Sequence, residues 1–172
     1  MGALVVYESM FGSTRAVAQA VADGITSIMP VEVVEVASAP DPSTLAVDVL
    51  VVGAPTHAFG LSRPLTRRAA AHRASKPLLS PARGVREWLG AAGSAHVPVA
   101  TFDTPVTRPN HGFASHAVER KLRRLGGAAL TRPATFYVRG GYEGPLLPGE
   151  LERAKVWGAE VAGKARDLAR RG

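Results

Sequence analysis

The sequence predicts an α/β protein in which a parallel sheet is covered by helices on both faces. Five short runs rich in β-branched residues recur along the chain, and segments with apolar residues at three- and four-residue spacing lie between and after them. The runs are almost continuously apolar, which is typical of strands buried on both sides. The 172 residues are about the length of one ordinary domain, so we expect a single domain over residues 1–172.

The expected strands lie at residues 3–7, 31–36, 48–54, 96–102 and 134–138. Helical spacing is clearest around residues 17–28, 118–125 and 151–168. The segment "ASAPDPSTLAV" between the second and third strands is too short and too rich in proline for a long helix. We expect a loop there with about one turn of helix.

Composition excludes several classes of protein. The chain is 46% hydrophobic and 20% charged, as globular proteins are, and no apolar run approaches the roughly 20 residues of a membrane helix. The start "MGALVVYESM" lacks the basic region and cleavage site of a signal peptide, so a cytoplasmic location is expected. The absence of cysteine excludes disulfides and thiol chemistry, so redox chemistry would need a bound cofactor. The five histidines show no metal-binding spacing, and no metal site is expected.

The join between the first strand and the first helix, "YESMFGSTRAV", has the chemistry of a phosphate site. Ser9, Ser13 and Thr14 supply hydroxyl groups, Gly12 permits close approach of the backbone, and the helix N-terminus favours an anion. The loop has neither the lysine of a nucleoside-triphosphate loop nor the glycine pattern of a dinucleotide site. These hydroxyls therefore suit a terminal monoester. The alternative is that Ser13 or Thr14 merely caps the helix.

The same residues carry a resemblance to a known family. The pattern Val5-Val6-Tyr7-x-Ser9-x-x-Gly12-x-Thr14-x-x-x-Ala18-x-x-Val21 resembles the amino-terminal signature of the flavodoxin family, and "GAPTHAFG" resembles its second cofactor loop. The resemblance implies a three-layer sandwich around a five-stranded parallel sheet in the order 2-1-3-4-5, which binds flavin mononucleotide (FMN) noncovalently. The response-regulator receiver domain shares this strand order but needs paired acids after the first strand, where this chain has one.

The resemblance also implies which residues contact FMN. The phosphate would lie on Ser9, Phe11, Gly12, Ser13 and Thr14. The ring would be framed by Pro55, Thr56, His57, Ala58, Phe59 and Gly60 after the third strand and by Asp103, Thr104, Pro105 and Gly112 after the fourth. Many flavodoxins stack a tryptophan and a tyrosine on the ring, but these two loops contain neither residue.

The net charge of +7 departs from the acidic character of simple flavodoxin shuttles. Six cations and no acid lie between residues 61 and 83, and without them the net charge would be +1. This basic insertion beside the expected flavin would attract an anionic substrate, an acidic redox partner or an acidic membrane surface; the alternative is a mobile, solvated excursion. Nucleic acid is not expected as a partner, because only 6% of the residues are aromatic and no reading motif is present.

The expected function is that of an FMN-binding electron-transfer protein, whose partner is a redox protein or a small-molecule acceptor. One alternative is an FMN-dependent oxidoreductase that acts on a quinone or other small acceptor, with residues 61–83 as a lid or wall. Another is a flavodoxin-like scaffold without FMN that serves as a binding module. No nucleophile and base fall together on strand ends, so no catalytic residue is assigned and the question of enzymatic activity stays open.

Overall fold

The computed structural model describes residues 2–57, 60–106 and 113–171. The strands are β1 (Ala3–Tyr7), β2 (Val31–Glu35), β3 (Val49–Pro55), β4 (Pro98–Thr104), β5 (Ala128–Ala129) and β6 (Ala134–Thr135). The α-helices are α1 (Ser13–Thr26), α2 (Pro64–Arg73), α3 (Val85–Ala91), α4 (Ala114–Arg124) and α5 (Glu150–Ala169). Two short 3-10 helices, η1 (Val36–Ser38) and η2 (Pro42–Thr44), form the expected loop between the second and third strands.

The strands form one parallel sheet in the order β2-β1-β3-β4-β5, with β6 also paired to β4. In the middle of the sheet, Val5 of β1 lies opposite both Val33 of β2 and Val51 of β3. Residues of β1, β3 and β4 are buried along nearly their whole length, because helices cover both faces. The expected strand order is confirmed.

The fifth strand differs from the expected single run at 134–138. It is divided into β5 and β6, which pair with successive parts of β4. Between the paired residues Val99–Ala129 and Phe102–Ala134, β4 advances three residues and the edge strand advances five, so two extra residues bulge from the ladder. A proline within the bulge has no N–H to donate, which suits its place on an edge strand.

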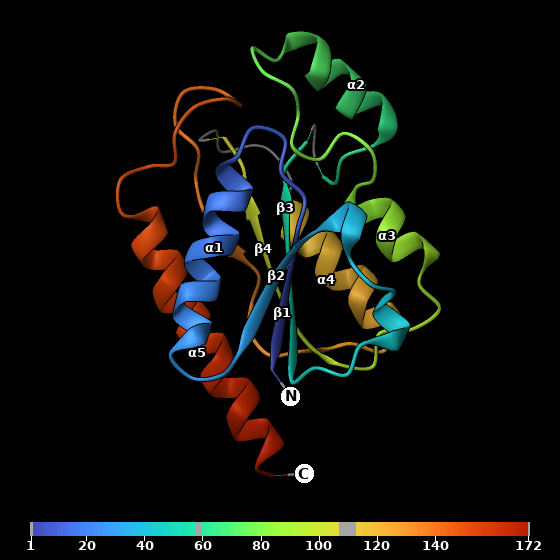
Figure 1. The fold of residues 1–172 in the computed structure, drawn as a ribbon, viewed down its shortest axis with the longest axis vertical. Coiled ribbons are helices and arrows are strands. Elements are labelled where there is room, and N and C mark those ends of the chain that lie inside the picture. The colour runs from blue at the N-terminus through green and yellow to red at the C-terminus, as the bar shows by residue number, and fades with distance from the viewer. Residues whose placement is uncertain (1, 58–59, 107–112, 172) are drawn as a thin grey trace.

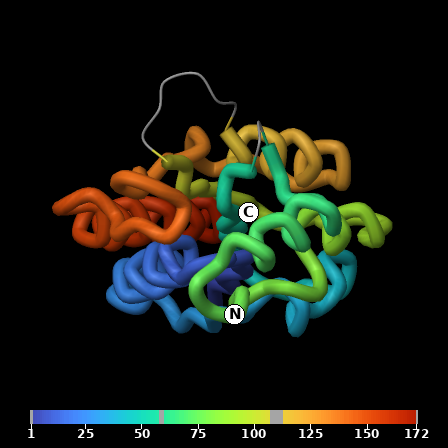
Figure 2. The backbone as a smooth tube through the Cα atoms, turned by 90° about the horizontal axis from the view of Figure 1, so that it is seen from above, coloured from blue at the N-terminus to red at the C-terminus, as the bar shows by residue number. Residues whose placement is uncertain are grey.

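Helices α1 and α5 cover one face of the sheet, and α3 and α4 cover the other (Figures 1 and 2). Each face has its own apolar core; the rings of Phe102, Phe136 and Trp157 meet edge to face in the first, about 6 Å apart. Helix α2 belongs to neither layer and stands beyond the carboxyl ends of the strands (Figure 1). No helix in the described part of the chain combines the length and apolarity needed to cross a membrane.

Two glycines bring α1 and α5 into direct backbone contact. A Cβ atom on Gly158 would lie 2.2 Å from the carbonyl oxygen of Val21, and one on Gly24 would lie 1.9 Å from that of Lys155. Both neighbours are backbone atoms, so neither site can accept a methyl group without moving a helix. By contrast, a Cβ atom on Gly163, also in α5, would have nothing within 4 Å.

We expect Gly158→Ala to lower the free energy of unfolding by about 1–3 kcal/mol, because the added methyl group overpacks the helix contact. The matched variant Gly163→Ala is expected to raise it by up to about 1 kcal/mol, since alanine favours a helix where there is room. Urea unfolding of the two variants and the parent measures both changes. Equal effects at the two positions would contradict the close contact of the helices.

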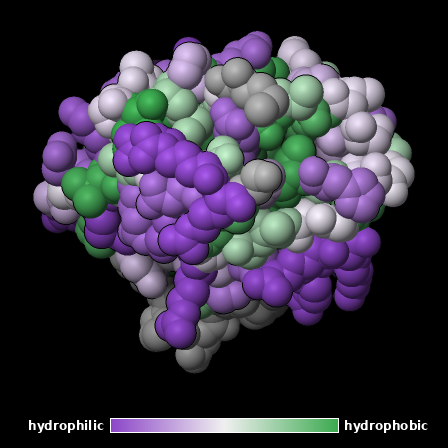
Figure 3. All heavy atoms as spheres, turned by 90° about the horizontal axis from the view of Figure 1, so that it is seen from below, coloured by the Kyte–Doolittle hydropathy of each residue, from purple (hydrophilic) through white to green (hydrophobic). Residues whose placement is uncertain are grey.

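The sheet brings its ligand-binding loops together at one edge. Tyr7, at the end of β1, lies opposite Gly53, and Pro55, at the end of β3, lies opposite Thr104 at the end of β4. The chain leaves β1 toward β2 and returns to β3 on the other side, so the strand order reverses between β1 and β3, where α/β sheets usually bind ligands. The opposite end of the molecule is largely hydrophilic, with apolar residues scattered over it (Figure 3).

Candidate functional site

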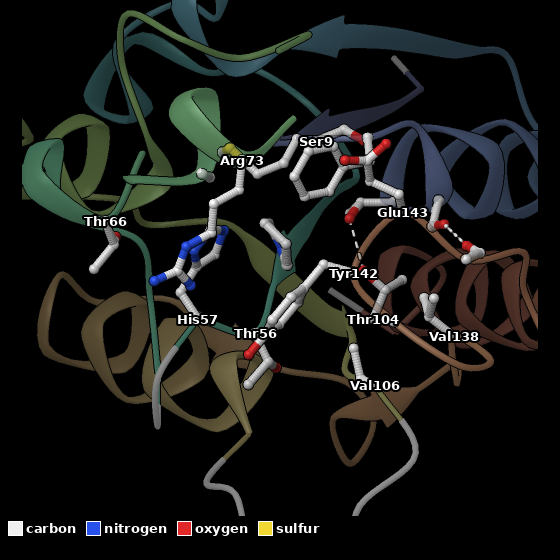
Figure 4. Close-up of a pocket in the computed structure, with 18 of the residues that line it drawn as sticks. Ser9, Thr56, His57, Thr66, Arg73, Thr104, Val106, Val138, Tyr142 and Glu143 are labelled. Carbon is white, nitrogen blue, oxygen red and sulfur yellow. Dashed lines mark hydrogen bonds between the residues drawn. The ribbon is translucent and has the colours of Figure 1, made fainter. Parts of the chain in front are cut away.

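A cavity of about 490 Å³ opens at the carboxyl ends of β1, β3 and β4 (Figure 4). Four segments line it: the loop after β1, the end of β3, the end of β4 and the loop after β6; α2 forms a further wall. The lining residues are Ser9, Met10, Phe11, Ser13, Thr14, Pro55, Thr56, His57, Thr66, Ala69, Ala70, Arg73, Thr104, Val106, Val138, Gly141, Tyr142, Glu143 and Gly144.

The loop after β1 leaves backbone N–H groups at the cavity. Gly12 is the N-cap of α1, with a left-handed φ of 106° that favours glycine. Ser9 Oγ accepts hydrogen bonds from the N–H groups of Gly12 (3.1 Å) and Arg15 (3.3 Å). The N–H groups of Ser13 and Thr14, at the first two positions of α1, have no acceptor among the described residues. The alternative that Ser13 or Thr14 caps the helix is wrong.

Side-chain hydroxyl groups connect this loop to its neighbours across the cavity. Thr14 Oγ1 lies 2.7 Å from Thr104 Oγ1, and this buried pair connects α1 to the end of β4. Ser13 Oγ donates to the carbonyl oxygen of Gly144 at 3.4 Å, which connects α1 to the loop after β6. Several hydrogen-bonding groups from different segments thus converge at one end of the cavity.

The acid beside this loop is directed away from it. Glu8 is fully buried and accepts hydrogen bonds from the hydroxyl group of Ser62 and, at 2.8 Å, from the N–H group of Val85. Burial raises the pKa of Glu8 above its usual range, although these hydrogen bonds and the charge of Arg67 oppose the change. The hydroxyl end of the cavity therefore has no carboxylate directed into it from the first loop, and its chemistry suits an anion such as a phosphomonoester.

The carboxylate of Asp103 accepts hydrogen bonds from other parts of the protein. This carboxylate is fully buried and accepts hydrogen bonds from both the N–H and the hydroxyl group of Ser115, each at 2.9 Å, so it stabilises the N-terminus of α4. Thr56 donates to the same carboxylate oxygen at 3.5 Å. Burial raises the pKa of Asp103, and the hydrogen bonds from Ser115 oppose the rise.

Comparison with known proteins adds a structural likeness. No family model matches the chain, and no curated protein sequence matches it significantly. A flavodoxin from the domain Archaea matches its structure with a TM-score of 0.69 at 21% identity, covering 96% of this chain and 99% of that one. Flavodoxin 1 from Bacillus cereus matches with 0.67 at 18% identity over 95% of this chain and 98% of that one. The chain has a flavodoxin-like fold. The flavodiiron protein from Giardia intestinalis also contains this fold: it matches with 0.63 at 19% identity over 99% of this chain, but over 37% of its own length.

Eight of the expected contact residues line the cavity of this flavodoxin-like domain: Ser9, Phe11, Ser13, Thr14, Pro55, Thr56, His57 and Thr104. Four do not line it: Gly12, Gly60, Asp103 and Pro105. Gly12 shapes the first loop, Gly60 forms paired backbone hydrogen bonds with His57, and Asp103 stabilises α4. Ala58, Phe59 and Gly112 lie outside the described residues.

Two further walls of the cavity contain none of the residues expected to contact FMN, although residues 61–83 are expected as a lid or wall in the oxidoreductase alternative. One is α2, which contributes Thr66, Ala69, Ala70 and Arg73, and the other contains Tyr142 and Glu143 in the loop after β6. The spacing of the four α2 residues is that of one helical face, but none of them is a large apolar residue, so an apolar pattern could not reveal it. The glycine-rich stretch around Tyr142 favours a turn over an approach of Glu143 to the site.

His57 is expected to stay neutral throughout the physiological range. Burial, assisted by the charge of Arg67, lowers the pKa of His57 from 6.5 to about 4. Between these values the unfolded chain binds more protons than the folded one, so stability should fall as the pH falls from about 6.5 to 4. NMR titration of the ring protons measures the pKa, and His57→Gln should remove this part of the pH dependence. A ring that titrates near pH 6.5 would contradict its burial.

Proposed function

We propose that this flavodoxin-like domain binds FMN noncovalently and transfers electrons. The observation that supports the proposal best is the convergence of hydroxyl groups at the N-terminus of α1 with N–H groups that have no acceptor in the described part of the chain, at one end of a cavity large enough for an organic cofactor. Its volume of about 490 Å³ lies within the usual range of ligand sites, roughly 300–1,000 Å³. The likeness to flavodoxins agrees with this proposal.

In the proposed complex, the FMN phosphate contacts Ser9, Ser13 and Thr14. Pro55, Thr56 and His57 flank the ring from the end of β3, where the neutral imidazole can donate or accept one hydrogen bond without adding charge. FMN supplies the redox chemistry, and the protein binds it, orients it and limits its contact with water. No step in this proposal needs a metal, and no three potential metal-ligating side chains gather within the described residues.

The visible spectrum of the purified protein tests FMN binding. After incubation with FMN and desalting, we expect the protein to retain flavin absorbance at about 450 nm. Riboflavin, which lacks the phosphate, is the matched control and should be lost on desalting. A colourless protein after desalting would contradict the proposal and favour a scaffold that binds no FMN.

The position of α2 favours a second candidate, an oxidoreductase that acts on a small acceptor. Simple electron carriers need an accessible flavin edge, whereas here α2 extends the cavity with an additional wall made by Thr66, Ala69, Ala70 and Arg73. Helix α2, which is part of the basic insertion, therefore forms one wall of the cavity. A carrier and an oxidoreductase differ in whether the FMN-loaded protein binds a small molecule beside the flavin.

A further inference from the structure

One face of α2 offers a small, defined surface to the cavity. Thr66, Ala69, Ala70 and Arg73 follow the i, i+3, i+4, i+7 spacing of a single helical face, and all four line the cavity. The two alanines in the middle leave space, and the polar groups lie at the ends. Figure 4 shows Thr66, Arg73 and His57 on one side of the cavity, away from Thr104 and Val138 at the other.

This wall is anchored firmly to the rest of the protein. Arg67, on another face of α2, is buried; its Nη1 donates to Ser62 Oγ (2.8 Å) and lies 3.0 Å from Glu87 Oε2. After α2, the N–H group of Leu79 donates to the carbonyl oxygen of Met10 at 3.1 Å. Helix α2 is therefore attached through its inner face and through the segment that follows it. A ligand would meet a preformed surface, which lowers the entropic cost of binding.

Arg73 brings a positive charge to this end without a compensating acid. No described carboxylate lies within ion-pair distance of it, and the short segments 58–59 and 107–112 contain no acid. Among the described lining residues, Glu143 is the only acid, and its two oxygens accept hydrogen bonds from the N–H and hydroxyl groups of Ser75. His57, on the same side, is neutral at pH 7 because burial lowers its pKa to about 4. A guanidinium group of this kind favours a carboxylate, which it can bind through two parallel hydrogen bonds.

The remaining surfaces suit a flat, conjugated molecule. Tyr142 is 61% exposed, and its ring points into the cavity from the loop after β6 (Figure 4). Ala69 and Ala70 offer an apolar surface on the α2 side, and aromatic rings favour stacked or edge contacts with such a molecule.

We propose that the α2 end of the cavity binds a small, flat, conjugated carboxylate beside FMN, with the carboxylate on Arg73 and the conjugated body against Tyr142 and the α2 alanines. The proposal rests on the proposed function, because it places this ligand next to the flavin. It names the class of small molecule that would make the protein an oxidoreductase. It also assigns the basic insertion a specific role, carried by one of its six cations.

Isothermal titration of the FMN-loaded protein with 2-naphthoate and with neutral 2-naphthamide tests this site. We expect 2-naphthoate to bind more tightly, and Arg73→Gln to weaken its binding about tenfold or more without changing the affinity for 2-naphthamide. Arg68→Gln is the matched control: it removes the same charge from an exposed position on α2 and should alter the affinity by less than about twofold. NMR shifts of the Ala69 and Ala70 amides should locate the ligand on α2.

Three results would overturn the proposal: no binding of 2-naphthoate, equal losses in Arg73→Gln and Arg68→Gln, or release of FMN as 2-naphthoate binds. The last would show that the ligand takes the place of the flavin. Retention of FMN is measured separately by absorbance. A protein that keeps FMN but binds no 2-naphthoate would therefore contradict the carboxylate site and leave the proposed FMN binding intact. If FMN is not retained, the proposed function fails, and the same titration of the FMN-free variants decides whether Arg73 binds a carboxylate.

Discussion

Ser13→Asp is expected to abolish FMN binding while it leaves the FMN-free protein about as stable as the parent. Ser13 is the first residue of α1 and lines the hydroxyl end of the cavity, and the first turn of α1 contains no acid. A carboxylate there interacts favourably with the helix dipole, by about 0.3–1 kcal/mol, which offsets the loss of the 3.4 Å hydrogen bond from Ser13 to Gly144. The same carboxylate repels a bound phosphate: two like charges 4 Å apart at an effective dielectric constant near 20 cost about 4 kcal/mol, or about a thousandfold in affinity.

An unchanged stability of the FMN-free protein would exclude a damaged fold as the cause of lost binding. Fluorescence titration with FMN measures the affinity, and urea unfolding of the FMN-free protein measures the stability. Ser13→Asn has the shape of the aspartate variant without its charge and should lose far less affinity. If Ser13→Asp kept FMN within about tenfold of the parent affinity, the phosphate would have to lie elsewhere.

The first loop could be predicted from the sequence because its geometry is local. A strand, a glycine and a helix within a few consecutive residues determine where the hydroxyl and N–H groups point. Even so, the sequence left open whether Ser13 or Thr14 caps the helix. The structure answers this with a contact between nearby residues, in which Ser9 Oγ accepts the N–H groups of Gly12 and Arg15.

Features that depend on distant contacts could not be predicted. The division of the edge strand is decided by its pairing with β4, because β5 and β6 are each two residues long and carry no pattern of their own. Asp103 follows the pattern of a ligand contact, since it lies near the end of a buried strand. One of its carboxylate oxygens stabilises α4, because the chain returns to place the N–H group of Ser115 against it. Sequence spacing alone does not determine that return.

The basic insertion, residues 61–83, shows most clearly that roles set by distant contacts cannot be predicted from the sequence. Its six cations look alike in the sequence, but the structure gives them different roles: Arg67 is 2% exposed, Arg73 lines the cavity and Arg68 faces solvent. The buried residue of α2 is an arginine, which interrupts the apolar pattern from which a buried helix face is predicted. The inner face of α2 therefore could not be predicted from the sequence. Part of this insertion forms helix α2, which is anchored by the most buried of these charges while most of its residues are exposed to solvent.

Arg67→Met is expected to lower the free energy of unfolding at pH 7 by about 3–5 kcal/mol. Arg67 interacts with Glu8 through the hydroxyl group of Ser62 and lies 3.0 Å from Glu87. Methionine fills a similar volume, so the main change is electrostatic: the fully buried Glu8 loses the neighbouring positive charge. Breaking such a network costs more than the network contributes, because a charge is left buried without compensation.

Equilibrium unfolding in urea at several pH values tests this origin, with Arg68→Met as the exposed control. Burial raises the pKa of Glu8 in the folded state, so the folded protein binds its proton more readily than the unfolded chain does. The stability that this proton confers is present at low pH and is lost as the pH rises through the folded pKa. The difference in stability between Arg67→Met and the parent should therefore narrow as the pH falls from 7 through the raised pKa of Glu8 and this residue becomes neutral. Adding Glu8→Gln to Arg67→Met should recover part of the loss at pH 7, because no buried charge then remains at that position. A loss that is independent of pH and simply additive in the double variant would show that Arg67 stabilises α2 by packing alone.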